Sequence, residues 1–295
     1  MSVIIGNKYE IINLIGEGSF GKVFKSKNIN TNQDVAIKIQ HKGITDVLKH
    51  EAKIYKYLSD VSGIPIIKNY GMDNGYNYLV LDLLDYSLDN KNISCNESIK
   101  YFINSLNIIE IIHSKGVLHR DIKPDNFLIK NINDRKELYI IDFGLSKLYI
   151  DSKKKHIEER NDRKLIGTIK YASPNLHNKI EASRRDDIIS ICYSFILIYN
   201  KKLPWDEEIE RYYREKKTIS KTSGSKINSE KTNSENINEI YNKIKEKKER
   251  IELLYDLPGE FITILLYCKK LKFLDKPNYK YLRGILENLL LNNSI

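Results

Sequence analysis

A glycine-rich turn between two strand-like segments constrains the fold of this chain more than any other feature. Residues 9–15 (YEIINLI) lead into the sequence GEGSFG, which contains Gly16, Gly18 and Gly21, and residues 22–25 (KVFK) lead out again. Because glycine has no Cβ, such a turn can bring backbone N–H groups close to phosphate oxygens. A dinucleotide-binding fold would require a helix after this turn, and β-branched and aromatic residues follow instead. The pattern therefore favours a β-hairpin that covers phosphate groups.

A lysine and a glutamate on the next two segments are candidates for an ion pair. Alternation in residues 34–40 (DVAIKIQ) predicts a strand with Lys38 on the face opposite its β-branched residues. Residues 45–58 have helical spacing, and Glu51 falls on their apolar stripe. A carboxylate in that position is costly unless it is paired, and Lys38 is its natural partner. The alternative is a solvated Glu51 at the edge of the stripe.

Residues 117–126 (VLHRDIKPDN) hold more hydrogen-bonding side chains than a structural loop needs. Asp121, Lys123 and Asn126 are close enough in sequence for a short loop to turn them toward one point. A carboxylate, an ammonium and an amide together suit a reaction that involves a proton, a phosphate and a metal ion. Taken alone, the stretch is equally compatible with a solvated turn.

The remaining pattern predicts strands early in the chain and helices later. A further strand is predicted at 77–84, and a hairpin at 127–129 and 138–141 ends in Asp142-Phe143-Gly144. Helices are predicted at 99–114, 186–199, 261–271 and 279–291. Between them lie a long polar loop at 145–174 and a Lys-, Glu-, Asn- and Ser-rich segment at 207–250, which we expect to be a mobile excursion.

The composition limits the class of protein. The 295 residues are 41% hydrophobic and 30% charged, and no apolar run reaches the length of about 18 residues that a membrane span needs. The N-terminus has neither a basic start nor a long apolar core, so no signal peptide is expected. Cys95, Cys192 and Cys268 are widely separated and have no metal-ligand spacing. We expect reduced thiols in an intracellular protein of the cytoplasm, the nucleus or both.

The formal net charge of +10 raises the possibility of a nucleic-acid partner. The lysines, however, are spread along the chain among many acidic residues, and clustered arginines with interleaved aromatic residues are not found. A solvated basic surface is the simpler interpretation, and it is compatible with anionic substrates.

The order of these features identifies a family resemblance. A glycine loop between strands, Lys38, Glu51, the HRDIKPDN stretch and an Asp-Phe-Gly sequence follow one another as in eukaryotic protein kinases. Within that superfamily the chain resembles the casein kinase 1 family, through the phrases HRDIKPDNFLI, IDFGLSK, GTIKYASPNLH, SRRDDIIS and LPW. The usual Ala-Pro-Glu motif is absent, and Ala172-Ser173-Pro174-Asn175 stands in its place, similar to the Ser-Ile-Asn of that family.

The resemblance implies an α+β, bilobal protein-kinase fold in a monomer. A small β-rich N-lobe with one key helix, residues 1–84, would bind nucleotide. A larger, mainly α-helical C-lobe, residues 85–295, would carry catalysis and substrate binding, with the polar insertion around 207–250 inside it.

The resemblance also implies that the cofactors are ATP and Mg²⁺. Lys38, paired with Glu51, would hold the α- and β-phosphates of ATP. Residues 81–84 would form the hinge that reads adenine through backbone groups. The whole ATP site would consist of Ile15, Gly16, Glu17, Gly18, Ser19, Phe20, Gly21, Val23, Ala36, Lys38, Leu81, Asp82, Leu84, Leu128 and Ile141.

The catalytic roles follow from the same resemblance. Asp121 would accept the proton of the substrate hydroxyl, and Lys123 would neutralise the phosphoryl group in transfer. Asn126 and Asp142 would bind Mg²⁺, which prefers amide and carboxylate oxygens. Arg120 could neutralise a phosphate in the loop at 146–173, but that loop has few hydroxyls, so we expect activity without loop phosphorylation.

The resemblance implies protein substrates whose Ser or Thr follows an acidic or phosphorylated residue. Arg163, Lys164 and Lys170 would form the substrate anion site. Lys170 stands where the family usually has arginine, and lysine offers no bidentate fork. Ile240 aligns with the second anion-binding lysine of the family, which argues against strict specificity for phosphorylated substrates.

The alternative to an active enzyme is a pseudokinase scaffold, with the kinase fold but little or no catalysis. Such proteins usually lose the strand lysine, the catalytic aspartate or the metal-binding aspartate. Lys38, Asp121 and Asp142 are all present in this chain, which favours the enzyme.

Overall fold

A computed structural model describes residues 3–18, 21–41, 43, 47–90, 92–222, 227–250 and 257–293. The chain divides into two compact units. Unit 1 comprises Met1–Asn92, Asn107–His119 and Pro124–Ile150, and unit 2 comprises Ile93–Leu106, Arg120–Lys123 and Asp151–Ile295. The predicted boundary at residue 84 stays a prediction.

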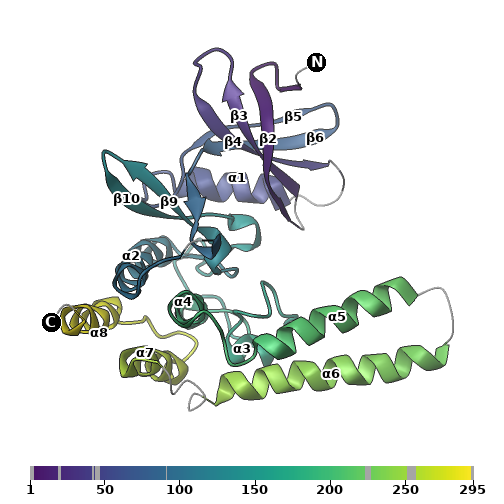
Figure 1. Ribbon diagram of the computed structural model, residues 1–295, viewed down its shortest axis with the longest axis vertical. Helices are drawn as coiled ribbons and strands as arrows, with labels where there is room; N and C mark the ends of the chain where they lie inside the picture. The colour runs from purple at the N-terminus through teal and green to yellow at the C-terminus, as the bar shows by residue number, and fades with distance from the viewer. Residues whose placement is uncertain are drawn as a thin grey trace. The chain divides into compact units, whose positions relative to one another are not determined.

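Unit 1 is built on an antiparallel sheet with the strand order β1-β2-β3-β4-β6-β5 (Figure 1). Its core is formed by Tyr9, Val35, Ile37, Tyr78 and Val80, because alternate residues of each strand face the same side. The predicted strand at 34–40 and the glycine-linked hairpin are confirmed. The six strands are β1 (Ile4–Ile5), β2 (Tyr9–Gly18), β3 (Gly21–Asn28), β4 (Asp34–His41), β5 (Ile67–Asp73) and β6 (Tyr76–Asp82).

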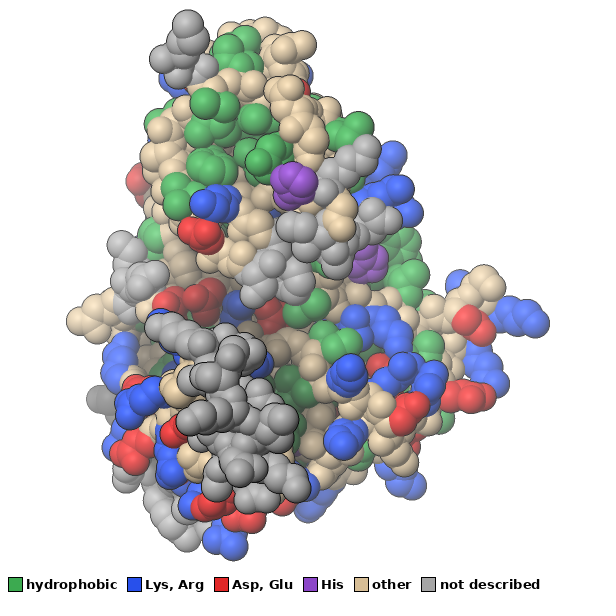
Figure 2. Space-filling model, turned by 90° about the vertical axis from the view of Figure 1, so that its right-hand side faces the viewer, with side chains coloured by type: hydrophobic (Ala, Val, Ile, Leu, Met, Phe, Trp, Pro, Cys, Tyr) green, Lys and Arg blue, Asp and Glu red, His purple; other side chains and the backbone are tan. Residues whose placement is uncertain are grey.

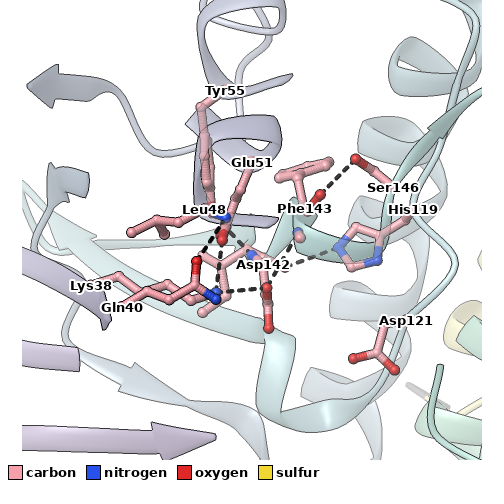
Figure 3. Close-up of polar contacts among 12 residues, drawn as sticks. Lys38, Gln40, Leu48, Glu51, Tyr55, His119, Asp121, Asp142, Phe143 and Ser146 are labelled. Carbon is pink, nitrogen blue, oxygen red and sulfur yellow. Dashed lines mark hydrogen bonds and ion pairs between the residues drawn. The ribbon is translucent and has the colours of Figure 1, made fainter. Parts of the chain in front are cut away.

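The helix α1 (Val47–Tyr57) contributes Leu48, Glu51 and Tyr55 to the interior of unit 1. Its first turn is tied to the sheet, since the backbone N–H of Leu48 donates to Oε1 of Gln40 at 3.3 Å (Figure 3). This bond satisfies one of the donors that a helix start leaves unpaired. The end of β4 therefore fixes where α1 begins.

Short elements complete unit 1 and carry its functional residues. The predicted hairpin is present, and Tyr86 and Ser87 pair with β9 as a third strand. A second small sheet pairs β8 with β11. These elements are β7 (Tyr86–Ser87), η1 (Leu88–Asn90), β8 (Val117–Leu118), η2 (Pro124–Asn126), β9 (Phe127–Ile132), β10 (Arg135–Ile140), η3 (Phe143–Leu145) and β11 (Lys147–Leu148).

The helix α2 (Cys95–Ser114) belongs to both units, because Ile93–Leu106 falls in unit 2 and Asn107–His119 in unit 1. It confirms the helix predicted at 99–114. Gly116 follows it with a φ of +79°, a left-handed conformation that glycine adopts without steric cost.

Unit 2 is organised around α4 (Arg184–Asn200), whose residues from Arg185 to Ile196 are all buried. An amphipathic pattern is missing from this helix because it is enclosed on every side. Phe195 of α4 stacks on Phe102 at a ring separation of 4.9 Å, and Phe261 also stacks on Phe102, at 5.6 Å. The other helices of unit 2 are α3 (Pro174–His177), α5 (Asp206–Thr222), α6 (Ile227–Glu249), α7 (Gly259–Lys270) and α8 (Tyr279–Asn292).

The excursion expected at 207–250 is largely helical in the structure. The long helices α5 and α6 lie side by side as an antiparallel pair (Figure 1). Salt bridges such as that of Lys243 with Glu239, one turn apart at 2.6 Å, support a helix that is polar on most sides. The mobility of this segment stays a prediction.

Two observations on the described residues concern the possibilities of a membrane span and of a nucleic-acid partner. No helix in these ranges is long and apolar enough to span a membrane. Figure 2 shows basic and acidic side chains interspersed over the helical part of the chain, rather than a continuous basic field. In the same view hydrophobic side chains gather in the upper part of the molecule. The exposed large hydrophobic residues of unit 1 include Ile4, Ile12 and Leu14.

Candidate active site

Three charged side chains meet inside unit 1. Nζ of Lys38 lies 2.8 Å from Oε2 of Glu51 and 2.9 Å from Oδ1 of Asp142 (Figure 3). Lys38 lies on β4 and Glu51 on α1, and Asp142 immediately precedes η3. The predicted ion pair between Lys38 and Glu51 is confirmed, and the alternative of a solvated Glu51 is wrong, since this side chain is 1% exposed.

Burial and charge act in opposite directions on this cluster. Burial alone would lower the pKa of Lys38, but the carboxylates of Glu51 and Asp142 outweigh it and raise that pKa to about 12. Burial raises the pKa of Glu51 to about 7, because desolvation costs more than the Lys38 ammonium returns. The pKa of Asp142 is lowered, since the attraction of Lys38 exceeds the opposing effect of burial. Lys38 and Asp142 therefore stay charged at neutral pH.

The backbone around Asp142 is held in a demanding conformation. Asp142 has a φ of +66°, which is uncommon for a residue with a side chain. Its N–H donates to the hydroxyl oxygen of Tyr55 at 3.0 Å, and Oδ1 accepts from the N–H of Gly144 at 3.4 Å. Phe143 is buried, with its ring 5.1 Å from that of Tyr55 and 4.9 Å from that of His119. The helix that carries Glu51 thus also positions Asp142.

Asn126 and Asp142 are the predicted metal ligands, and both belong to unit 1. Asn126 is buried at the end of η2, and its carbonyl accepts from the N–H of Ile141 at 3.0 Å, next to Asp142 in sequence. Within the described part of the chain the hydrogen bonds of the Asp142 side chain use Oδ1, which leaves Oδ2 for a cation. The donor set fits Mg²⁺, which uses one or two carboxylates and takes its other ligands from water and substrate phosphates. Among the described residues there is no group of three His, Cys, Asp or Glu that could hold a metal by itself.

The other residues predicted to line the ATP site also lie in unit 1. Gly16 faces Val23 across β2 and β3, and Gly18 faces Gly21. Ser19 and Phe20 lie outside the described residues. Of the predicted set, Leu84 is buried, Ile15, Glu17 and Gly18 are exposed, and the rest are half-buried: Gly16, Gly21, Val23, Ala36, Leu81, Asp82, Leu128 and Ile141.

Asp82 has its carboxylate engaged within unit 1. Oδ1 lies 2.9 Å from Nζ of Lys68, and Oδ2 accepts from the N–H of Ile66 at 3.0 Å. The side chain of Asp82 is therefore occupied, which is compatible with the predicted hinge role because that role uses backbone groups.

A second cluster, in unit 2, surrounds Asp121. Oδ1 of Asp121 accepts from the N–H of Thr168 at 2.9 Å and from its hydroxyl at 2.8 Å, and Oδ2 lies 3.2 Å from Nζ of Lys123. Gly167 has a φ of +92°, and a Cβ there would clash with the carbonyl oxygen of Arg120. The carboxylate that sequence patterns select as the base is therefore buried, oriented and next to a cation.

Arg120 carries the backbone strain of this cluster. Its φ is +67°, and its N–H donates to Oδ1 of Asp187 at 2.9 Å. Asp187 is buried in the first turn of α4. The core helix of unit 2 therefore holds the residue that precedes Asp121 in a conformation that an unsupported loop would relax.

The residues predicted for substrate anions have partners inside unit 2. Nε of Arg163 lies 2.7 Å from Oε2 of Glu181, and Nζ of Lys170 lies 2.9 Å from Oδ1 of Asp206. Lys164 is exposed. Arg163 and Lys170 therefore contact different acidic residues, and these contacts do not join the three predicted residues into one anion site.

Sequence reasoning missed several residues that hold the predicted ones. Thr168 and Gly167 lie in the GTIKYASPNLH phrase, and Asp187 lies in SRRDDIIS, but neither phrase was given a physical role. Tyr55 lies in the apolar helical pattern of residues 45–58, which by itself predicts packing and no polar contact. Its position four residues after Glu51, on the same helix face, was the available signal.

The comparison with known families agrees with this geometry. Residues 9–257 match the protein kinase domain family. A β-sheet lobe and a helical lobe confirm the predicted bilobal protein-kinase fold. The match covers most of the chain and includes Lys38, Glu51, Asp121, Asn126 and Asp142, so the chain belongs to the protein kinase domain family.

Proposed function

We propose that this protein kinase is a Ser/Thr kinase of the casein kinase 1 family that uses ATP and Mg²⁺. The observation that carries the proposal is the assembled state of both clusters. Lys38 contacts Glu51 and Asp142 in unit 1, and Asp121 is oriented by Thr168 beside Lys123 in unit 2. The assignment to this family rests on the sequence phrases quoted above.

Unit 1 supplies the groups for the nucleotide in this proposal. Lys38 holds the α- and β-phosphates as a fixed point charge, because two carboxylates keep its ammonium in place. Gly16, Gly18 and Gly21 allow close approach of the backbone to the phosphates. Asn126 and Asp142 would hold Mg²⁺, which neutralises charge on the phosphates when bound.

Unit 2 supplies the groups for the acceptor. Asp121 takes the proton from the Ser or Thr hydroxyl as its oxygen bonds to the γ-phosphorus and the bond to the leaving ADP oxygen breaks. Thr168 keeps Oδ1 of Asp121 engaged, and Lys123 neutralises charge on the transferred group.

Independence from loop phosphorylation is part of the proposal, and Glu181 supports it. Glu181 is buried, pairs with Arg163 and attracts Arg120 electrostatically. Burial lowers the pKa of Arg120, and the Glu181 carboxylate acts against that effect. The chain thus contains the negative charge that a phosphorylated residue would otherwise bring to these arginines.

Acidic or phosphorylated protein substrates are the favoured class. The loop with Arg163, Lys164 and Lys170 is basic, and Lys164 is exposed. The partners of Arg163 and Lys170 mean that a substrate anion would compete with Glu181 and Asp206, which favours acidic substrates without strict dependence on phosphorylation. We further propose that the enzyme acts as an intracellular monomer.

A phosphotransfer assay separates this function from a pseudokinase scaffold. Purified wild-type chain, Asp121→Ala and Asp125→Ala would be incubated with radiolabelled ATP, Mg²⁺ and casein. Asp125 is an exposed carboxylate four residues after Asp121 and serves as the matched control. We expect labelling by the wild type and Asp125→Ala and only background from Asp121→Ala. Equal labelling by all three proteins, or no labelling by the wild type, would contradict the proposal that this chain is an active kinase.

A further inference from the structure

A lysine that no part of the proposed mechanism uses is completely enclosed in unit 2. Lys248 lies in the last turn of α6 and is 2% exposed. Its Nζ donates to the carbonyl oxygens of Ile169 at 2.6 Å and Ala172 at 2.8 Å, and lies 3.2 Å from Nε2 of His177. Burying an ammonium group is costly, so three converging acceptors indicate a specific role.

Aromatic rings complete the surroundings of this amine. Nζ lies 5.1 Å from the ring centroid of Trp205 and 5.5 Å from that of Tyr193. Both distances allow a cation–π interaction, which is strongest away from water. Among the described residues Lys248 forms no salt bridge to a carboxylate. Burial lowers its pKa well below the ordinary value for lysine.

The segment that Lys248 contacts, residues 168–172, has a bonded carbonyl at every position. Lys248 donates hydrogen bonds to the carbonyl oxygens of Ile169 and Ala172. Nε1 of Trp205 donates to the carbonyl of Lys170 at 2.9 Å, and the hydroxyl of Ser190 donates to that of Tyr171 at 2.9 Å. The carbonyl of Thr168 accepts from the N–H groups of Tyr171 and Ala172.

The first residue of this segment is the one that orients the proposed base. Thr168 donates two hydrogen bonds to Asp121, from its N–H and its hydroxyl. The turn that closes on the carbonyl of Thr168 ends at Ala172, the residue bound by Lys248. A continuous series of contacts therefore runs from the end of α6 to the carboxylate of Asp121.

We propose that Lys248 is a positioning residue for phosphotransfer, which holds residues 168–172 in the conformation that keeps Thr168 on Asp121. Its effect on catalysis rests on the proposed function, whereas its effect on the segment does not. Methionine at this position would match its length and apolar contacts and leave two buried carbonyls without their donor.

The adjacent lysine offers a matched control. Lys247 is one third exposed, lies 2.7 Å from a carboxylate oxygen of Glu208, and donates to the carbonyl of Pro204 at 2.9 Å. Neither of these contacts involves residues 168–172. Lys247→Met therefore removes the same charge from the same helix turn without touching the segment.

Two measurements test the proposal on the full chain. Hydrogen exchange would be followed at the amides of Tyr171 and Ala172, and kcat with casein would be compared with the KM for ATP. For Lys248→Met we expect exchange at both amides to accelerate about tenfold or more, and kcat to fall about tenfold with little change in the KM for ATP. Lys247→Met should match the wild type in all of these.

A conservative variant guards against a general loss of folding. Lys248→Gln keeps an uncharged donor that can serve one of the two carbonyls, so its exchange rates and kcat should fall between those of the wild type and Lys248→Met. If Lys248→Met does not fold, the test rests on Lys248→Gln, which should show faster exchange and a lower kcat than the wild type.

The outcomes are distinguishable from those of the phosphotransfer assay. Wild-type exchange at Tyr171 and Ala172 in Lys248→Met, or in Lys248→Gln where only that variant folds, overturns the proposal. Accelerated exchange with an unchanged kcat overturns the catalytic role. If the wild-type chain proves inactive, that same catalytic role fails with the proposed function, while exchange still decides whether Lys248 holds the segment.

Discussion

Two lysines of this kinase with little solvent exposure, Lys38 and Lys248, solve the same physical problem in opposite ways. Lys38 is paired with two carboxylates, which raise its pKa to about 12. Lys248 has carbonyl oxygens and aromatic rings around it, and its pKa is lowered. Carboxylates fix a charge that can be offered to an anionic ligand, whereas neutral acceptors hold a segment of backbone. The partners, rather than the burial, indicate what a buried lysine is for.

The largest expected effect comes from removing Lys38, the lysine that the proposed function assigns to the phosphates of ATP. Lys38→Met leaves Glu51 and Asp142 without their cation and removes a phosphate contact, so kcat with casein should fall about a hundredfold or more. In Lys248→Met, kcat should fall only about tenfold. Steady-state kinetics of the two variants test the comparison, and equal losses would contradict it.

The carboxylate beside Lys38 should make stability depend on pH. The pKa of Glu51 is about 7 in the folded chain against a usual 4.5, so between these values the folded state binds more protons than the unfolded state. The Glu51 contribution to the free energy of unfolding should therefore decrease as pH rises from 4.5 to 7, by up to about 3 kcal/mol. Glu51→Gln should remove this contribution. Urea unfolding of both proteins across that range measures the difference in slope, and parallel curves would show that Glu51 is not responsible.

The glycine that precedes the segment held by Lys248 should also be sensitive to substitution. Gly167→Ala introduces a Cβ against the carbonyl of Arg120 at a left-handed φ, which should destabilise the chain by about 1–3 kcal/mol and lower kcat. Gly284→Ala in α8, where a Cβ meets nothing within 4 Å, is the control. Thermal unfolding and casein phosphorylation follow both variants. A Gly167→Ala protein as active and stable as the control would show that Asp121 tolerates movement of its support.

The smallest expected effect is at the hydroxyl that supports Asp142. Tyr55→Phe keeps the ring contact with Phe143 and removes the acceptor for the Asp142 N–H, at a cost of about 1 kcal/mol. Exchange at the Asp142 amide should accelerate while kcat changes about twofold. A larger loss of kcat than in Lys248→Met would reverse the ranking of the two regions.

The Lys38 region could be predicted from the sequence because its signals are in side chains. A strand lysine and a glutamate on an apolar helix stripe can be recognised without coordinates. The Lys248 region could not be predicted, since its acceptors are backbone carbonyls, which every residue has. Lys248 also lies in the charged run EKKER, which is typical of a solvated helix face.

The helices in the same part of the chain could not be predicted from composition. The Ser- and Asn-rich stretch at 221–236 is typical of a mobile excursion and gives no helix signal, yet α6 begins at Ile227. The pairing of α5 with α6, and buried contacts of α6 at Ile240, Ile244 and Lys248, stabilise a helix that local propensity does not.

The course of the chain through the two units has a practical consequence for dissecting this kinase. The chain passes from unit 2 to unit 1 within α2, returns after His119 and leaves again after Lys123. A single cut can therefore release neither unit as one uninterrupted segment. Expression of residues 1–84 or 85–295 alone would divide unit 1, so functional studies of one half need substitutions in the intact chain rather than truncation.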